Sequence, residues 1–170
     1  MEIKEILAQL IGLCAVVFFI SSIQLKEKTK ILFFQLVANI FYFIQYILLG
    51  VYVAAFMNLL TIWRCFVFKK YDEQNKTIPL KYLIIFVSLI IVFGIFNYNG
   101  ILSIIPPVIT IIYGISSYQK NTEIIRLTFL LCAFIWIFYN FSVGAYTALI
   151  GNGFEVISGV IALIRFRKNK

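Results

Sequence analysis

Two asparagines and one glutamate stand out because they lie inside strongly apolar segments of the chain. Asn58 and Asn152 have mainly apolar neighbours, and Glu155 follows Asn152 at a spacing that places both on about the same face of a helix. Polar side chains at bilayer depth are costly unless they face a bundle interior, a cavity or one another. A carboxamide supplies hydrogen-bond donors and an acceptor. Asn58 and Asn152 are therefore expected to line a cavity and to hold hydroxyl or amide groups of a neutral solute.

Glu155 is the acidic residue that lies within an apolar segment, and an intramembrane acid is a functional candidate by default. Its carboxyl group could bind a proton, pair with a cationic substrate or pair with Arg64. Arg64 lies near the end of its own apolar segment and is expected to extend its head group towards the lipid headgroups.

Two stripes of polar and aromatic residues recur at helical spacing in two other apolar segments. The first contains Gln35, Asn39, Tyr42 and Tyr46, and the second contains Cys132, Trp136, Tyr139 and Asn140. Tyr42 and Trp136 are expected to enclose a flat or ring-shaped solute. Hydrogen bonds that join neighbouring helices explain the same stripes equally well, so both interpretations stay open.

Pro106 and Pro107 lie within the apolar sequence ILSIIPPVITIIYG. A proline inside a helix removes a backbone donor and clashes with the preceding turn, so a bend is expected there. Gly12 aligns with Pro107 in the internal repeat described below. These three positions are the expected hinges.

The composition excludes most soluble functions. The chain has 170 residues, of which 62% are hydrophobic and 13% are charged, with no His and 7 acidic residues. Average soluble chains are about half apolar and a quarter charged. Metal sites and acid–base pairs lack their usual residues, so we expect no enzyme activity, no metal and no cofactor. Cys14, Cys65 and Cys132 are scattered singly and are expected to be small buried hydrophobic residues.

The apolar residues fall into seven runs, each about long enough to cross a bilayer as a helix. The expected limits are Ile6 to Ile23, Ile31 to Leu49, Val53 to Phe68, Tyr82 to Phe96, Ile101 to Tyr118, Leu127 to Val143 and Thr147 to Ile164. The fold class expected from this pattern is an all-α polytopic membrane protein with seven transmembrane helices.

The basic residues predict the orientation of these helices, because Lys and Arg near span ends are retained in the cytoplasm. In a seven-helix arrangement every Lys and Arg except Lys4 falls on one side. The N-terminus is therefore expected outside and the C-terminus in the cytoplasm of a bacterial inner membrane. The same asymmetry explains the net charge of +8 without a nucleic-acid partner.

An internal repeat divides the chain into two similar parts. A shift of 95 residues aligns ISSIQ at 20–24 with ISSYQ at 115–119, and a shift of 94 aligns GVYVA at 50–54 with GAYTA at 144–148. The second shift carries Asn58 onto Asn152. We expect a first three-helix bundle in residues 1–70, a cytosolic loop and linker helix in residues 71–99, and a second bundle in residues 100–170. Both bundles then have the same orientation, which is a transporter architecture.

This 3+1+3 plan resembles the SWEET and PQ-loop superfamily of transporters, and within it the chain looks like the bacterial YgjV-type inner-membrane proteins. Gln24 and Gln119 match the glutamine of the Pro-Gln pair that closes the first helix of each PQ-loop bundle, whereas Ile23 and Tyr118 stand at its proline positions. The resemblance implies that Asn58 and Asn152 correspond to paired, cavity-facing asparagines of SWEET-type proteins.

A small-solute transporter that works by alternating access, with the lipid bilayer and a small polar molecule as its partners, is the function expected from these observations. Its site would include Asn39, Tyr42, Asn58, Trp136, Tyr139, Asn140, Asn152 and Glu155. Uniport is the simpler mechanism, and proton coupling through Glu155 is a further hypothesis. The alternatives are a facilitator that resembles the PnuC vitamin transporters, and an integral membrane scaffold or partner subunit. The sequence does not specify the oligomeric state.

Overall fold

Residues 3–167, the part of the chain that the structure describes, fold into seven α-helices and one short 3-10 helix and contain no strand. This is a computed structural model, in which side chains are described as far as residue 165. The helices are α1 (Ile3–Ile23), α2 (Lys28–Leu48), α3 (Tyr52–Glu73), α4 (Leu80–Phe96), η1 (Ile101–Ile104), α5 (Ile105–Tyr118), α6 (Thr122–Ser142) and α7 (Tyr146–Arg167). The all-α class and the number of α-helices expected from the apolar runs are confirmed.

Six of these helical segments are long and apolar enough to cross a membrane, and α4 is a shorter apolar helix of 17 residues. A helix of 21 residues, such as α1 or α2, spans roughly 30 Å at 1.5 Å per residue, which is the thickness of the bilayer core. The outer surface of the bundle carries many large apolar side chains, among them Leu13, Phe66, Ile95, Phe138 and Ile157. Lipid is the solvent that such a surface fits.

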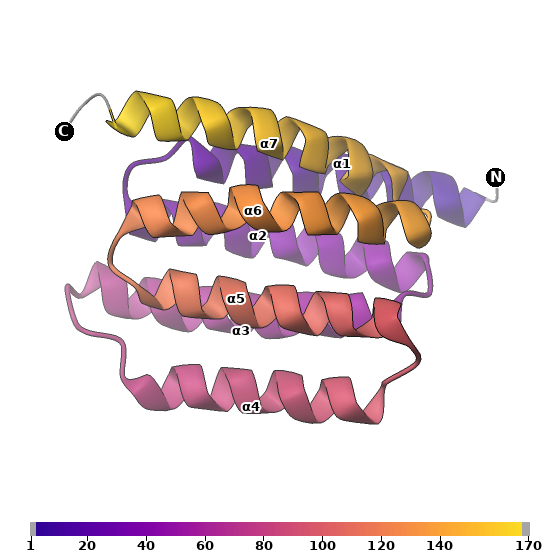
Figure 1. Cartoon of the computed structure of the whole chain (residues 1–170), viewed down its shortest axis with the longest axis horizontal. Helices are drawn as coiled ribbons and strands as arrows, with labels where there is room; N and C mark the ends of the chain where they lie inside the picture. The colour runs from indigo at the N-terminus through magenta and orange to yellow at the C-terminus, as the bar shows by residue number, and fades with distance from the viewer. Residues whose placement is uncertain (1–2, 168–170) are drawn as a thin grey trace.

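Six helices form a closed ring, and α4 lies outside it. Around the ring, α1 packs on α2, α2 on α3, α3 on α5, α5 on α6, α6 on α7, and α7 on α1. Figure 1 shows the ring as two layers of three helices, with α1, α2 and α3 behind α7, α6 and α5. The helix α4 packs against α3 and α5 at the edge.

The helix bounds repeat along the chain. A shift of 94 residues carries the bounds of α2 onto those of α6 and the bounds of α3 onto those of α7, and a shift of 95 carries the end of α1 onto the end of α5. Equivalent helices run in the same direction in Figure 1, where the two termini lie at opposite ends of the bundle. The ring contacts obey the same relation, because the packing of α1 on α7 corresponds to that of α5 on α3.

The loops that follow α2 and α6 also have matching backbones. Gly50 and Gly144 both adopt a positive φ, 74° and 71°, which favours glycine because it has no Cβ. The N–H group after each glycine donates to a carbonyl near the helix end, Val51 to Tyr46 at 2.9 Å and Ala145 to Asn140 at 3.0 Å. Each of these is the 6→1 hydrogen bond of the Schellman motif, which commonly ends α-helices. The repeat seen in the sequence is therefore also present in the local geometry.

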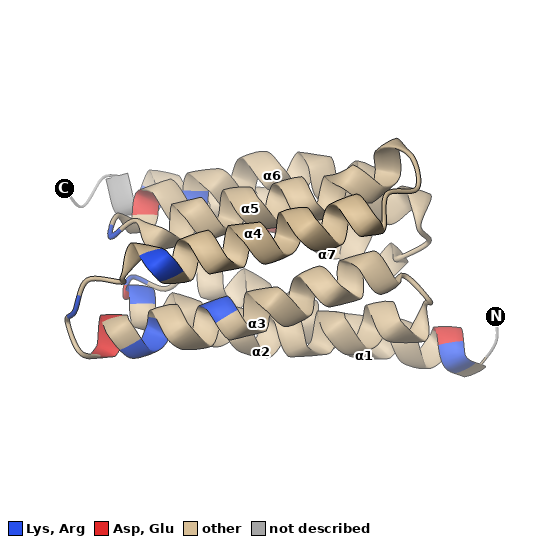
Figure 2. Cartoon of the chain, turned by 90° about the horizontal axis from the view of Figure 1, so that it is seen from below, with Lys and Arg blue, Asp and Glu red and all other residues tan. Residues whose placement is uncertain are grey.

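The charged residues gather at one end of the bundle. Figure 2 shows Lys and Arg mainly towards the end where the C-terminus lies, whereas the first turn of α1, which holds Lys4, lies at the other end. The structure thus separates the basic residues along the helix direction as the sequence predicts. Arg167, Lys168 and Lys170, which the orientation argument also used, lie outside the described side chains.

The two prolines do not lie in the middle of a continuous helix, where a bend was expected. Residues Ile101–Ile104 form the 3-10 helix, and α5 begins at Ile105, so Pro106 and Pro107 lie in its first turn. Proline is tolerated there because the N–H groups of a first turn have no intrahelical partner. The irregular point is therefore a junction between two helix types. Gly12 lies within an unbroken α1, where a Cβ would come within 2.3 Å of the Gln45 side chain, so close packing explains this glycine.

Candidate functional site

A cavity of about 50 Å³ lies inside the six-helix ring, with walls from α1, α2, α3, α5, α6 and α7. This volume is enough for water molecules, because one water needs about 10–15 Å³. Among the expected site residues, those that line the cavity are Asn39, Tyr42, Asn58, Trp136, Asn140, Asn152 and Glu155. Tyr139 is not among the lining residues. It is buried beside the cavity in an apolar cluster with Ala54, Ala55 and Ala148.

A chain of hydrogen bonds crosses the ring between α2, α6 and α7. The Tyr46 hydroxyl donates to the Asn140 Oδ1 at 2.7 Å, and the Asn140 Nδ2 donates to the Asn152 Oδ1 at 2.8 Å. The Asn152 Nδ2 in turn donates to the Glu155 Oε2 at 2.9 Å. The network fixes the orientation of the Asn152 carboxamide and holds one oxygen of the Glu155 carboxyl group.

Asn58 lines the same cavity but has different partners. Its Nδ2 donates to the backbone carbonyl of Ala54 at 2.8 Å, one turn back on its own helix. Thr61 and Asn39 bond in the same manner, to the carbonyls of Met57 and Gln35. The structure therefore brings Asn58 and Asn152 to one cavity without joining their side chains, and Asn39, Asn58 and Thr61 of the first half are each held by their own helices.

Glu155 lines the cavity, and one of its carboxyl oxygens has no hydrogen-bond partner among the described residues. The residue is 3% exposed, and its Oε1 accepts no hydrogen bond from the described residues. The carboxyl group therefore retains an acceptor for a ligand, because a buried polar atom left unsatisfied is costly.

Arg64 also lines the cavity, and the prediction that it extends towards the lipid headgroups is wrong. It is 1% exposed, its guanidinium lies 5.6 Å from the centre of the Phe86 ring, and its Nη2 donates to the Cys65 Sγ at 3.3 Å. The Nε and Nη1 atoms have no hydrogen-bond partner in the described part of the chain. Arg64 and Glu155 face one cavity, and no ion pair joins them among the described residues.

Aromatic rings form much of the remaining wall. Tyr42 and Trp136, which the shift of 94 residues relates, both line the cavity. Tyr42 stacks on Tyr46 with ring centres 6.3 Å apart, and Trp136 packs edge-on against Tyr139 at 5.3 Å. Each ring is held by a neighbour on its own helix, which fixes the shape of the wall.

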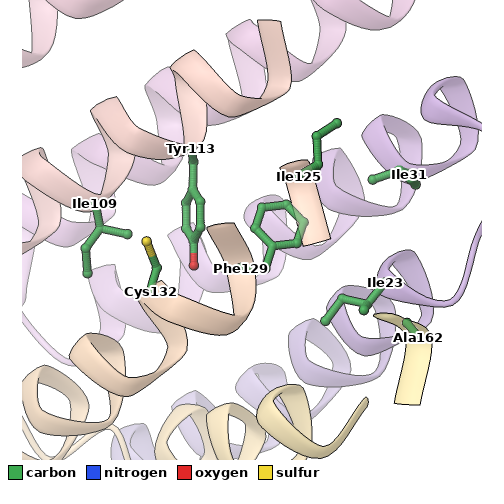
Figure 3. Packing of buried hydrophobic residues seen from close by; sticks show 8 residues of the cluster. All are labelled: Ile23, Ile31, Ile109, Tyr113, Ile125, Phe129, Cys132 and Ala162. Carbon is green, nitrogen blue, oxygen red and sulfur yellow. The ribbon is translucent and has the colours of Figure 1, made fainter. Parts of the chain in front are cut away.

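Apolar clusters lie at both ends of the cavity. The cluster at the basic end contains Ile23, Ile31, Ile109, Tyr113, Ile125, Phe129, Cys132 and Ala162 (Figure 3). Tyr113 and Phe129 belong to this cluster and also line the cavity, so the cluster forms one end of it. The cluster at the opposite end contains Tyr46, Ala54, Ala55, Tyr139, Ala145 and Ala148. Each cluster draws residues from both halves of the chain.

Several lining residues were missed or misjudged from the sequence. Arg64 follows Thr61 at the same spacing that separates Glu155 from Asn152, and this spacing was the signal that could have placed it on the inner face. For Thr110 and Tyr113, helical spacing was the one feature of the sequence that could have indicated that they line the cavity. Cys14 is exposed on the outer surface, so the prediction that it is buried is wrong, whereas Cys65 and Cys132 are buried as expected. Within residues 3–167 no group of His, Cys, Asp or Glu could hold a metal ion.

An all-helical fold with an apolar outer surface and a polar interior cavity defines a polytopic membrane protein. The family model Imp-YgjV, described as bacterial inner membrane protein, matches residues 6–170. The chain therefore belongs to this family of multi-pass bacterial inner-membrane proteins. No curated protein and no solved structure matches the chain.

Proposed function

We propose that the protein transports a small solute by alternating access between two parallel three-helix bundles, residues 1–70 and 100–170, which α4 joins. The observation that carries this proposal is the polar cavity between the two halves. Its wall contains five pairs of residues related by the repeat: Gln35 and Phe129, Tyr42 and Trp136, Tyr46 and Asn140, Asn58 and Asn152, and Thr61 and Glu155. Parallel repeats with a site at their interface are a recurrent transporter architecture.

The two apolar clusters supply the barriers that alternating access requires. Rocking of one bundle against the other would separate the cluster at one end of the cavity while the cluster at the other end stays closed. Because both clusters contain residues from both bundles, relative motion of the bundles acts on them directly. The junction between η1 and α5 at Pro106 and Pro107, and the glycine at Gly12, remain the proposed hinges.

Membership in the SWEET and PQ-loop superfamily forms part of this proposal. The Gln24 side chain, at the end of α1, donates to the Ser158 hydroxyl at 2.7 Å and to the Ser158 carbonyl at 3.0 Å, so it links the first bundle to α7. Gln119, its repeat equivalent, is exposed. A glutamine that crosses the bundle interface at the end of the first helix supports a role in their relative movement.

The proposed orientation places the N-terminus outside and the C-terminus in the cytoplasm. It is supported by the concentration of basic residues at one end of the bundle. Proton coupling through Glu155 is the second part of the mechanism that we propose for testing. Solute uptake that is unaffected by Glu155→Gln and by external pH would contradict proton coupling and leave uniport.

A ligand screen followed by flux measurements tests the proposed function. Purified protein would be screened with sugars, polyols, amino acids and aromatic vitamins for an increase in the unfolding temperature, which ligand binding produces by mass action. Compounds that bind would then be measured for uptake into proteoliposomes. We expect uptake that Asn152→Ala and Trp136→Ala each reduce at least tenfold, whereas Ile157→Ala, on the outer surface of α7, leaves it unchanged.

The same experiment separates the alternatives. Binding confined to flat aromatic compounds and abolished by Trp136→Ala would favour the vitamin-type facilitator. Proteoliposomes that show no uptake of any bound compound would contradict transport and favour a scaffold or partner subunit.

A further inference from the structure

The strongest unused feature of the cavity is that a basic and an acidic side chain line it without an ion pair between them. Arg64 and Glu155 are 1% and 3% exposed, both line the cavity, and no ion pair joins them among the described side chains. A buried charge without a partner is strongly unfavourable. The two groups therefore define what a ligand must supply.

The buried side-chain atoms of the cavity wall that lack a hydrogen-bond partner among the described residues come from both halves of the chain. Donors without an acceptor are Arg64 Nε, Arg64 Nη1 and Gln35 Nε2, and Gln35 is 1% exposed. Gln35 and Arg64 are neighbours, because the Cys65 Sγ lies 3.3 Å from Arg64 Nη2 and 3.9 Å from Gln35 Oε1. In the second half, the cavity-lining atoms without a partner are the Glu155 Oε1, which is an acceptor, and the Tyr113 hydroxyl, which can donate or accept. The first half thus presents an anion-binding group, and the second half presents an acceptor for a donor.

The repeat gives the relative depth of these groups. Glu155 is equivalent to Thr61, and Arg64 follows Thr61 by three residues on α3. Three residues of α-helix advance about 4.5 Å along the axis. The Cα atom of Arg64 therefore lies about 4.5 Å nearer the basic end of the bundle than the repeat equivalent of Glu155, an offset on the scale of a small zwitterion.

On this basis we infer that the ligand is a small zwitterion of the α-amino-acid type. Its carboxylate binds Arg64 and Gln35, and its ammonium group donates to Glu155. The inference rests on the proposed function and names its substrate class. A neutral sugar would offer Arg64 no anion, a simple anion would offer the Glu155 carboxyl group no donor, and a simple cation would leave Arg64 unpaired.

Binding to the purified full-length chain tests the inference. The probes are the twenty standard L-amino acids, with the N-acetyl and carboxamide derivatives of each amino acid that binds, and glucose as a neutral solute. The measurement is the unfolding temperature as a function of probe concentration. We expect at least one free amino acid to bind, its N-acetyl and carboxamide derivatives to bind at least tenfold more weakly, and glucose not to bind.

Variants then test whether Arg64 and Glu155 bind the ligand. Arg64→Gln and Glu155→Gln are each expected to raise the dissociation constant at least tenfold. Lys30→Gln removes a positive charge from an exposed side chain near the same end and is expected to leave it unchanged. If Arg64→Gln does not fold, Gln35→Glu serves instead, because it is close to isosteric and places a carboxylate beside Arg64 that excludes the ligand carboxylate.

The outcomes distinguish this inference from the function on which it rests. The zwitterion proposal would be overturned if none of the twenty amino acids binds, or if amino-acid binding is insensitive to both Arg64→Gln and Gln35→Glu. Uptake of a neutral solute without amino-acid binding would overturn it and leave transport intact. Amino-acid binding with the expected variant effects, but without uptake into proteoliposomes, would support the zwitterion and contradict transport.

Discussion

The Tyr46 hydroxyl donates a 2.7 Å hydrogen bond to the carboxamide of Asn140, and the two residues are separated by 94 positions, the shift that relates the two halves. Each is therefore the repeat equivalent of the other. The bond lies where the two halves meet, between the middle helices α2 and α6 of the two layers. It begins the network that continues through Asn152 to Glu155.

Removal of this hydroxyl is expected to weaken the association of the halves. Tyr46→Phe leaves the buried Asn140 Oδ1 without its donor, and the expected loss is about 1 kcal/mol of unfolding free energy. Chemical unfolding in detergent measures it. Tyr52→Phe, which removes the hydroxyl of a 66% exposed tyrosine, is the matched control and should have no effect. Equal stability of both variants would argue against a formed bond.

Two glycines of α7 provide a matched test of how closely α7 packs on α1. A Cβ at Gly151 would lie 2.3 Å from Cγ2 and 3.2 Å from Cβ of Val16, whereas a Cβ at Gly153 meets nothing within 4 Å. Gly151→Ala is expected to destabilise the protein by about 1–3 kcal/mol through overpacking. Gly153→Ala should be neutral or stabilise it by up to about 1 kcal/mol, because alanine favours helix. Unfolding midpoints of both variants measure the difference, and a stabilising Gly151→Ala would refute the close approach.

Arg126 of α6 links the second half to the end of α1. Its Nε donates to the Ile23 carbonyl at 3.2 Å and its Nη2 to the Leu25 carbonyl at 2.5 Å. A cation at a helix C-terminus satisfies free carbonyls and opposes the negative end of the helix dipole. We expect Arg126→Gln to lower the unfolding free energy by about 2 kcal/mol, the typical contribution of charged hydrogen bonds.

Lys30→Gln is the control for Arg126→Gln, because Lys30 has a 58% exposed side chain in a surface ion pair. Such pairs contribute little. If the two variants unfold at the same midpoint, Arg126 does not hold the end of α1.

The proposed orientation predicts which loops face the outside of the cell. Asn99, in the loop between α4 and η1, and Asn75, in the loop between α3 and α4, are both exposed and lie at opposite ends of α4. In intact spheroplasts, an impermeant thiol reagent should label Asn99→Cys and should label Asn75→Cys only after lysis. The reverse pattern would invert the orientation.

The sequence predicted the helices well because span length and apolar composition depend on local residues. The seven helices lie within a few residues of the apolar runs, and Gly50 and Gly144 marked the repeated loop. The partners of each polar side chain depend on helix rotation and on which helices become neighbours. The internal repeat therefore placed Asn58 and Asn152 at one cavity without predicting that Asn58 bonds to its own helix. The position of Arg64 near the end of its apolar segment led to a wrong prediction, because an arginine there can point towards lipid or towards the interior.

The central claim is that Asn152 lies on a solute pathway that opens to both sides of the membrane. The direct test replaces Cys14, Cys65 and Cys132, introduces Asn152→Cys, and applies an impermeant thiol reagent to right-side-out and inside-out vesicles. Ile157→Cys, on the 58% exposed outer face of the same helix, is the control. The account predicts labelling of the cysteine at 152 from both sides and none at 157. Resistance of position 152 to the reagent from either side would contradict it.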